Sequence, residues 1–490
     1  MTNLLSKQTL DTLSEAVKKP AYAYQTAEVG IVHIGIGAFH RAHQAVFTDD
    51  LLALDPHWKI TAVSLRSPAI RDSMAPQDNL YTVVERGAQE DKFRIVGAID
   101  QVLVAPEEPQ RVIDEIANSK TKVVTLTVTE KGYCRDKSGK NLDFTNPVIV
   151  HDIADLSTPK SLPGFIVAAC KLRMRTNEKL TIISCDNLSA NGQVTERVIQ
   201  QFAQHVAPDV AAWITKNVSF CNSMVDRIVP ATTEKDIDSV SQILGVVDKS
   251  TVVTEPFKQW VIEDNFANDK PAWDKVGALF VADVHAYEHM KLRLLNGIHS
   301  TLAYIGFLKG YEYIHQAVAD EDCLLFVKAL QAQLVSTLDD VPGIDLSAYA
   351  DTILARFANE RVPYKTSQVA CDGSQKLAQR LVKPCEIIRK SGAISEYITF
   401  VLAAWCRFLE GTDSAGSAFS ITDPLGDALN NLAVRHCNNE LKQVESILRE
   451  SGICTTQQLA DSDFLTAIAT HLKEIHQVGV TQALSAFLKR

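Results

Sequence analysis

The sequence predicts an α/β domain with a doubly wound parallel sheet, followed by a mostly α-helical domain. At 490 residues the chain is too long for one hydrophobic core, so at least two domains are expected. In the first half, short apolar runs alternate with longer polar-patterned stretches, which is typical of strands separated by helices. Beyond about residue 285, apolar residues recur at three- and four-residue spacing, as in helices. We therefore expect an α/β domain over residues 1–284 and a helical domain over residues 285–490.

The individual elements follow from the same patterns. Apolar or β-branched runs predict strands over 31–37, 58–65, 121–128 and 180–187. The longer stretches between them predict helices within 106–119 and 163–177. In the second half, helices are expected within 300–318, 321–338, 394–411 and 464–477.

The charge and composition of the chain limit its partners. The net charge is −10, whereas nucleic acid and anionic membranes both favour a basic surface. No apolar run approaches the roughly 18 residues that a membrane helix needs, and the first residues do not form a secretory signal. The ten cysteines, from Cys134 to Cys454, form no CxxC pair, which favours reduced thiols. We therefore expect a soluble cytoplasmic protein; its oligomeric state stays open, and a monomer is compatible with the sequence.

A glycine turn follows the first strongly predicted strand. In IVHIGIGAFHRAHQA, Gly35 and Gly37 stand between a predicted strand and a predicted helix, where glycine lets a pyrophosphate approach the backbone. The third glycine of the usual G-x-G-x-x-G pattern is replaced by His40. A purely structural turn is the alternative, but the strand before and the helix after favour a dinucleotide. The candidate cofactor-binding residues are Gly35, Ile36, Gly37, Ala38, Phe39, His40 and Arg41.

The end of the second strand bears on which dinucleotide is bound. An acidic residue there would bind the ribose 2′-hydroxyl and favour NAD. The sequence AVSLRSPAIR has no Asp or Glu from Ser64 to Ser67, and Arg66 could tolerate a 2′-phosphate. NAD is the expected cofactor, with NADP not excluded.

The stretch KLRLLNGIHS combines apolar residues with a cation, an amide and an imidazole. At about 100° per residue, Asn296 lies roughly 140° and His299 roughly 80° around an α-helix from Lys291, and Glu288 falls roughly 60° away. These side chains thus share a sector, for which a solvated helix face is the alternative. Alcohol–ketone interconversion needs a general base for the hydroxyl proton and neutral donors for the oxyanion. Lysine suits the first role, asparagine the second, and histidine can orient the substrate.

Two further stretches carry candidate residues. In SCDNLSANG, Asn187 ends a predicted strand, at the sheet edge where doubly wound folds bind ligands. In NSMVDRIVP, Asp226 lies in an apolar segment, where an ion pair with Arg227 or another residue is the alternative role. A catalytic metal is a competing chemistry, because His285 and His289 have helical spacing, but no HExxH motif or cysteine cluster accompanies them.

Six stretches together resemble the mannitol dehydrogenase family, the polyol-specific long-chain dehydrogenases. They are GIGAFHRAHQA, TVTEKGYC, SCDNLSANG, MVDRIVP, EPFKQWVIEDNF and KLRLLNGIHS, and the resemblance extends from about residue 29 to at least residue 411. The resemblance implies a metal-independent NAD(P) enzyme with a Rossmann-type N-terminal domain and a mostly helical C-terminal domain. The roles it implies are general base for Lys291, oxyanion stabilisation for Asn187 and Asn296, substrate positioning for His299 and Asp226, and proton exit for Glu130 and Glu288.

Within the family, TEKGYC, the pair Asn146–Pro147 and DGSQKLAQR (372–380) look closest to members that interconvert D-fructuronate and D-mannonate with NAD(H). Ala378 departs from the proline expected there, which bears on the geometry of the loop. These sugar acids carry a carboxylate that needs a cation, for which Lys376 and Arg380 are the candidates, with surface charge as the alternative. Members that act on mannitol also carry a cation in this loop, so mannitol or another polyol is the alternative substrate. A catalytically idle dinucleotide-binding protein is the alternative of a different class.

Overall fold

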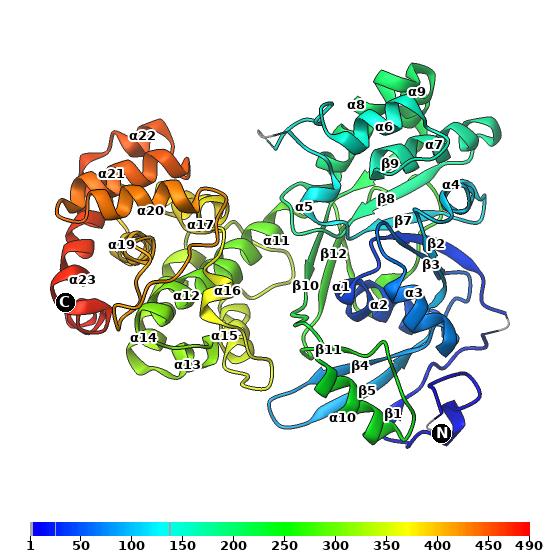
Figure 1. The fold of residues 1–490 in the computed structure, drawn as a ribbon, viewed down its shortest axis with the longest axis horizontal. Helices are drawn as coiled ribbons and strands as arrows, with labels where there is room; N and C mark the ends of the chain where they lie inside the picture. The colour runs from blue at the N-terminus through cyan, green and yellow to red at the C-terminus, as the bar shows by residue number, and fades with distance from the viewer. Residues whose placement is uncertain (1–2, 25, 137–138) are drawn as a thin grey trace. The chain divides into compact units, whose positions relative to one another are not determined.

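The computed structural model describes residues 3–24, 26–136 and 139–490. The chain forms two compact units, Met1–His285 and Ala286–Arg490 (Figure 1). Three sheets lie in the first unit, and the second is built from helices. All ten cysteines are free thiols. Over the described residues, no helix is both long and apolar enough to cross a bilayer.

The central sheet of the first unit has six parallel strands in the order β6-β3-β2-β7-β8-β9. Counted within this sheet, the order is 3-2-1-4-5-6, that of the dinucleotide-binding doubly wound fold, so the expected fold class is confirmed. The order reverses between β2 and β7, and folds of this kind bind ligands outside the carboxyl ends of such strands. The strands are β2 (Val29–Ile34), β3 (Lys59–Ser64), β6 (Ile99–Val104), β7 (Val123–Leu126), β8 (Leu180–Ser184) and β9 (Val218–Cys221).

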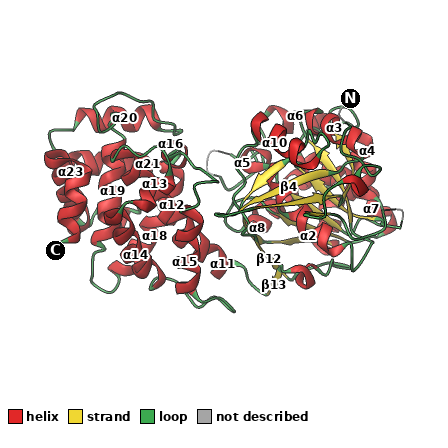
Figure 2. Ribbon diagram, turned by 90° about the horizontal axis from the view of Figure 1, so that it is seen from below, coloured by secondary structure: helices red, strands yellow, loops and turns green. Residues whose placement is uncertain are grey.

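Side chains on both faces of this sheet are buried. On β2, Ile31 packs into one core and its neighbour Val32 into the other, and Ile183 and Ile182 of β8 divide in the same way. A strand covered on both faces is apolar at successive positions, which is why the sequence predicts these strands. Figure 2 shows helices around the sheet. The helices of the first unit are α1 (Ala38–Ala42), α2 (Gln44–Leu51), α3 (Ala69–Met74), α4 (Pro109–Ala117), α5 (Thr129–Gly132), α6 (Pro147–Ala154), α7 (Leu162–Thr176), α8 (Asn191–Val206), α9 (Pro208–Asn217) and α10 (Glu234–Leu244), with short 3-10 turns η1 (Leu10–Thr12), η2 (Ala75–Gln77) and η3 (Trp273–Val276).

Two smaller sheets, absent from the sequence-based expectation, complete the first unit. Their strand orders are β1-β5-β4-β11 and β10-β12-β13. They join distant parts of the chain: Val252 of β11 lies beside Val83 of β4, and Met224 of β10 lies opposite Val261 of β12. The strands are β1 (Val17–Lys18), β4 (Tyr81–Arg86), β5 (Asp91–Val96), β10 (Ser223–Asp226), β11 (Val252–Thr254), β12 (Gln259–Glu263) and β13 (Leu279–Val281).

The second unit is organised around α19, which is buried at every position from Ile398 to Cys406. The long helix α23 packs along α19. The four stretches expected to be helical contain α12, α14, α19 and the first part of α23. The helical segments are α11 (His285–Met290), η4 (Lys291–Gly297), α12 (Ile298–Leu308), α13 (Ile314–Ala319), α14 (Glu321–Val335), α15 (Leu346–Phe357), α16 (Thr366–Val369), α17 (Gly373–Leu377), η5 (Ala378–Val382), α18 (Lys383–Arg389), α19 (Glu396–Phe408), α20 (Gly426–Arg435), α21 (Glu440–Ser451), α22 (Thr456–Leu459) and α23 (Ser462–Leu488).

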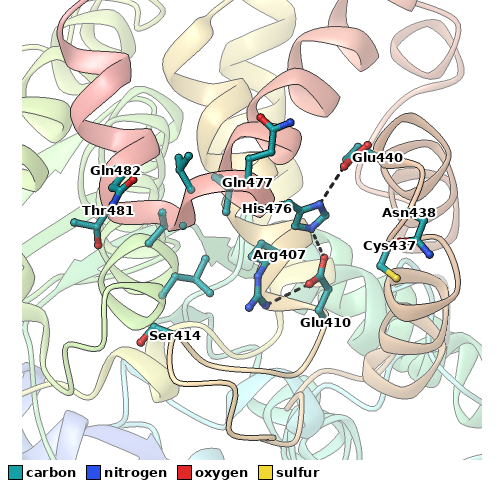
Figure 3. A pocket seen from close by; sticks show the side chains of 15 residues that line it. Arg407, Glu410, Ser414, Cys437, Asn438, Glu440, His476, Gln477, Thr481 and Gln482 are labelled. Carbon is teal, nitrogen blue, oxygen red and sulfur yellow. Dashed lines mark hydrogen bonds and ion pairs between the residues drawn. The ribbon is translucent and has the colours of Figure 1, made fainter.

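The helix α23 is broken at Gly479. This residue has φ 77° and ψ 159°, a conformation that is almost restricted to glycine. A pocket of about 810 Å³ lies beside the break (Figure 3). In that pocket His476 reaches between two carboxylates, with Nε2 2.7 Å from Glu410 and Nδ1 3.3 Å from Glu440. Arg407 pairs with Glu410 at 3.4 Å, so the charged groups of this pocket are paired with one another.

The His476 cluster predicts a pH-dependent contribution to stability. Burial alone would lower the pKa of His476, but the hydrogen bonds and charges of Glu410 and Glu440 outweigh it and raise the pKa above 6.5. Because the folded pKa is the higher one, this contribution is full below the unfolded pKa and disappears as the pH rises through the folded pKa. We expect His476→Gln to lower the free energy of unfolding by about 1 kcal/mol more at pH 6 than at pH 9. Urea unfolding of both proteins at the two pH values measures it, and an equal loss at both would contradict the assignment.

Candidate functional site

The glycine turn after β2 is built on a close backbone contact. Gly35 has φ +103°, and a Cβ atom there would lie 2.1 Å from the carbonyl oxygen of Thr127, just beyond β7. Only glycine fits such a position. In front of Gly37, by contrast, a Cβ atom would meet only the Gly35 oxygen, at 3.9 Å. The turn therefore presents an open stretch of backbone at the carboxyl ends of β2 and β7, as a pyrophosphate site requires.

Two of the residues expected to bind cofactor, His40 and Arg41, have buried side chains. The His40 ring is fully buried and stacks on His33, with ring centroids 3.3 Å apart. Burial and the neighbouring His33 lower the pKa of His40, so the ring is neutral. Arg41 is buried as well and donates to the Ser250 carbonyl oxygen at 2.6 Å. In this conformation these two residues can offer a ligand their backbone, but their side chains face the core.

Asp186, which the sequence reasoning missed, organises the edge where Asn187 lies. Its carboxylate accepts hydrogen bonds from the backbone N–H groups of Val128 (3.0 Å) and Thr129 (2.8 Å) and from the Tyr133 hydroxyl (2.6 Å). These bonds tie the loop after β7 to the end of β8. Asn187 follows directly and is exposed in a bend. Asp186 stands beside Asn187 in the SCDN motif, so the sequence shows its position, but it does not show which groups donate hydrogen bonds to it.

The other first-unit candidates lie at separate places. Glu130 is exposed on the short helix α5. Asp226 is buried at the end of β10. Its neighbour Arg227 forms an ion pair with Glu85 at 2.5 Å and donates to the Glu255 carbonyl oxygen. Arg227, which the sequence suggested as an alternative partner of Asp226, thus has Glu85 as an ion-pair partner.

In the second unit, the stretch KLRLLNG forms a π-helix, η4, rather than an α-helix. The angles calculated for an α-helix do not apply here, because a π-helix closes i→i+5 hydrogen bonds and takes more residues per turn. Lys291 and Asn296, five residues apart, therefore fall about one turn apart on the same side. Short π-helical segments are frequent at functional sites. Glu288, on the preceding helix α11, is buried.

Asn296 and His299 each bury a polar atom that lacks a hydrogen-bond partner among the described residues. The atoms are Nδ2 of Asn296 and Nε2 of His299. Leaving a buried polar group unpaired costs about 1–3 kcal/mol, so native structures leave few such groups without a partner. Both atoms are accordingly candidates to bind a polar ligand or water.

Arg380 fixes the position of η4. Its Nη1 donates to the Ser300 hydroxyl at 2.9 Å and to the Asn296 carbonyl oxygen at 3.4 Å. A Cβ atom on Gly297 would lie 3.1 Å from the Arg380 carbonyl oxygen, so glycine allows the second π-helical segment, η5, to approach. Arg380 is thus a structural anchor as well as a candidate for substrate binding. The other end of η4 is held by Arg293, which donates to the backbone and hydroxyl oxygens of Thr337.

Three cations act on the His299 ring, and one of them, Lys376, also pairs with Asp372 at 3.5 Å. The His299 ring stacks on Phe357 at 4.5 Å. Burial and the charges of Arg380, Arg356 and Lys376 lower the pKa of His299 to about 3, so the ring is neutral. Lys376 donates to the Cys371 carbonyl oxygen at 2.7 Å. Arg356, at the end of α15, was not identified from the sequence, because no local motif accompanies it.

The described residues contain no group of three His, Cys, Asp or Glu side chains arranged to hold a metal ion. His285, one of the histidines considered as a ligand, forms a 2.5 Å hydrogen bond with Asp283.

Comparisons with known proteins cover both units. The family model of the mannitol dehydrogenase Rossmann domain matches residues 29–275, and that of the mannitol dehydrogenase C-terminal domain matches residues 283–476. The chain is 40% identical to D-mannonate oxidoreductase of Escherichia coli K12, over 96% of this chain and 98% of the relative. It is 36% identical to mannitol 2-dehydrogenase of Aspergillus fumigatus, over 96% of each chain.

Solved structures show the same similarity. Mannitol 2-dehydrogenase of Pseudomonas fluorescens, in a ternary complex with NAD and D-mannitol, is 38% identical, covers 99% of each chain and has a TM-score of 0.86. A substrate-free D-sorbitol dehydrogenase is 29% identical, covers 98% of this chain and 100% of its own, and has a TM-score of 0.91.

Replacing either glycine of the turn by alanine should lower the free energy of unfolding by very different amounts. Gly35→Ala must fit a Cβ atom against the Thr127 carbonyl at positive φ, and we expect a loss of about 2–4 kcal/mol in the free energy of unfolding. Gly37→Ala has open space and ordinary backbone angles, and should change stability by less than about 1 kcal/mol. Denaturant unfolding of the two variants provides the comparison. Equal losses would mean that the close contact at Gly35 does not constrain the turn.

Proposed function

The chain belongs to the mannitol dehydrogenase family, and from this premise we propose that it interconverts D-fructuronate and D-mannonate by hydride transfer with NAD(H). The family assigns it to the oxidoreductases. The relatives alone do not select the substrate, because D-mannonate oxidoreductase is 40% identical and mannitol 2-dehydrogenases are 36–38% identical.

The choice of substrate is supported by the sequence of the loop 372–380 together with the cations around His299, although members that act on mannitol share a cation in that loop. Arg380, Arg356 and Lys376 all act electrostatically on the His299 ring. Mannonate and fructuronate carry a carboxylate, which cations bind through charge-assisted hydrogen bonds, whereas mannitol and fructose have none. Lys376 and Arg380 are the proposed carboxylate-binding residues. Arg380 uses one nitrogen for Ser300, and guanidinium has further N–H donors for a substrate.

Lys291 is the proposed general base. As the hydride leaves the secondary carbon of mannonate, the hydroxyl proton must pass to a base so that a carbonyl can form. In the reverse direction the ammonium returns the proton to the oxygen. Glu288 and Glu130 are the proposed route for that proton to solvent. The proposal uses no metal ion.

Asn296 and Asn187 are the proposed donors to the developing oxyanion. Fixed amide N–H groups stabilise charge at that oxygen without giving up a proton. The unpaired Nδ2 atom of Asn296 supports this role. His299 has a neutral ring, and its Nε2 atom has no hydrogen-bond partner in the described part of the chain, which suits bonding to a substrate hydroxyl. Asp226 is the proposed second positioning residue.

The cofactor assignment rests on the doubly wound sheet and the open backbone at Gly37. Bound there, NAD would supply the acceptor for the hydride; the relative from Pseudomonas fluorescens was solved in complex with NAD. In this proposal the backbone from Gly35 to Arg41 faces the pyrophosphate, and the small Gly37 lets it approach.

Replacing the base should abolish most of the turnover. Lys291→Met keeps the length of the side chain but removes its proton acceptor, and we expect kcat to fall by about 10²–10⁴-fold. NADH binding, followed by fluorescence, should be unchanged. The matched control is Lys390→Met, since Lys390 is 71% exposed and pairs across the surface with Glu386. A loss of less than about tenfold would show that Lys291 is not the base.

The substrate choice predicts a preference for the sugar acid. With NADH, kcat/KM for D-fructuronate should exceed that for D-fructose by at least about 10²-fold, the value of one charge-assisted interaction. Lys376→Met should raise KM for fructuronate by about tenfold and leave that for fructose within about twofold. A preference for fructose would instead support a mannitol 2-dehydrogenase. Cofactor binding without turnover of any sugar acid or polyol would support the idle-protein alternative.

A further inference from the structure

A second feature of the first unit lies beyond the glycine turn. A pocket of about 550 Å³ opens where β3 and β6 end, beside the amino end of α4. Its size falls in the range of small-molecule and cofactor sites. Its lining comprises Leu65, Arg66, Ala105, Pro106, Pro109, Lys131, Gly132, Cys134, Asn146, Val148, Thr158, Pro159, Lys160, Ser161, Leu162 and Phe165.

The charge of this lining is one-sided. Arg66, Lys131 and Lys160 contribute three cations, and the lining contains no aspartate or glutamate. Among the residues described, no ion pair joins any of these three cations to a carboxylate. Nearby cations outside the lining are paired: Arg71 contacts Asp72 and Glu107. In a chain of net charge −10, three unneutralised cations around one pocket indicate an anionic ligand.

The end of β3 offers nothing that would repel such a ligand. A carboxylate at this position binds the ribose 2′-hydroxyl and excludes a 2′-phosphate by charge repulsion. Here the strand ends in Ser64, whose hydroxyl donates to the Ser67 carbonyl oxygen, and Arg66 stands between them, exposed. An arginine in this place accommodates a 2′-phosphate in other dinucleotide-binding folds.

The remaining walls suit an aromatic base. Leu65, Pro106, Pro109 and Phe165 give the pocket apolar surface beside its cations. A flat apolar base and an adjacent phosphate together match the adenosine 2′-phosphate end of a dinucleotide. The pocket lies at the same carboxyl edge of the sheet as the glycine turn, which is where that end belongs in the 3-2-1-4-5-6 fold.

We propose that this pocket binds the adenosine 2′-phosphate of NADP(H) through Arg66, with Lys131 and Lys160 adding positive charge, so that the chain uses NADP(H) as well as NAD(H). The inference deepens the proposed function and rests on it for the dinucleotide. Arg66 is then the residue that determines cofactor specificity.

Binding of nucleotide fragments to the full chain tests the pocket without relying on turnover. By titration calorimetry, 2′,5′-ADP should bind at least tenfold more tightly than 5′-AMP, because only the former carries the 2′-phosphate. Arg66→Ser should remove that preference and leave 5′-AMP within about threefold. Arg71→Ser is the matched control, since Arg71 lies outside the lining, and it should keep the preference. Equal binding of the two fragments, or a preference unaffected by Arg66→Ser, would overturn the proposal.

Steady-state assays separate this inference from the proposed function. With D-fructuronate, the wild-type chain should oxidise both NADH and NADPH, and Arg66→Ser should lower kcat/KM for NADPH at least tenfold while NADH changes less than threefold. Turnover with NADH and none with NADPH would reject the phosphate site and leave the proposed function standing. Preferential 2′,5′-ADP binding without turnover of any sugar would reject the proposed function and leave the phosphate site standing.

Discussion

The carboxyl edge of the central sheet, where the glycine turn lies, depends on the contact between the Gly35 backbone and Thr127. No side chain fits between them, because a Cβ atom would approach the carbonyl oxygen to 2.1 Å. The Thr127 hydroxyl donates to the Gly35 carbonyl oxygen at 2.7 Å, and the two segments are held together at this point. Asp186 then secures the next residues of the loop through its bonds to Val128 and Thr129. The positions of the glycine turn, of α5 and of Asn187 all follow from this one point of closure between β2 and β7.

In the second unit, the π-helical segment η4 is held in place by two arginine side chains. A π-helix is rarer and less well packed than an α-helix, so η4 needs outside support. Arg380 supplies it at one end and Arg293 at the other, each by donating to carbonyl and hydroxyl oxygens. The result is a helix that holds Lys291 and Asn296 on one side and leaves Nδ2 of Asn296 buried without a partner among the described residues. Rigid support of unsatisfied polar atoms is what preorganised binding requires.

The sequence predicts what local patterns encode. Strands β2, β3, β7 and β8 are apolar on both faces, and the long helices carry regular spacing. The strand β11 was missed because its pairing with β4 joins residues as far apart as Val83 and Val252, whereas the missed strands β4 and β5 pair locally, with Arg86 opposite Asp91. The motif KLRLLNGIHS identified the candidate residues, yet its π-helical geometry was hidden, because composition does not distinguish i→i+4 from i→i+5 bonding. Arg356 and Asp186 were missed for a related reason: their importance comes from partners that only the folded chain brings near.

The break at Gly479 separates the last helical turns, residues 480–488, from the rest of α23, to which they stay linked through this one residue. Residues 480–488 leave the axis of α23 and place Phe487 among Phe326, Tyr397 and Phe400, with ring centroids 5.0 to 5.4 Å apart. The match to the family's C-terminal model stops at residue 476, before this segment begins. A segment joined to the rest of its helix through one glycine meets its contact residues at an effective concentration in the millimolar range or above, so individually weak aromatic contacts suffice to hold Phe487 in place. The end of the chain thus behaves as an intramolecular ligand of α14 and α19, with the covalent link supplying much of its affinity.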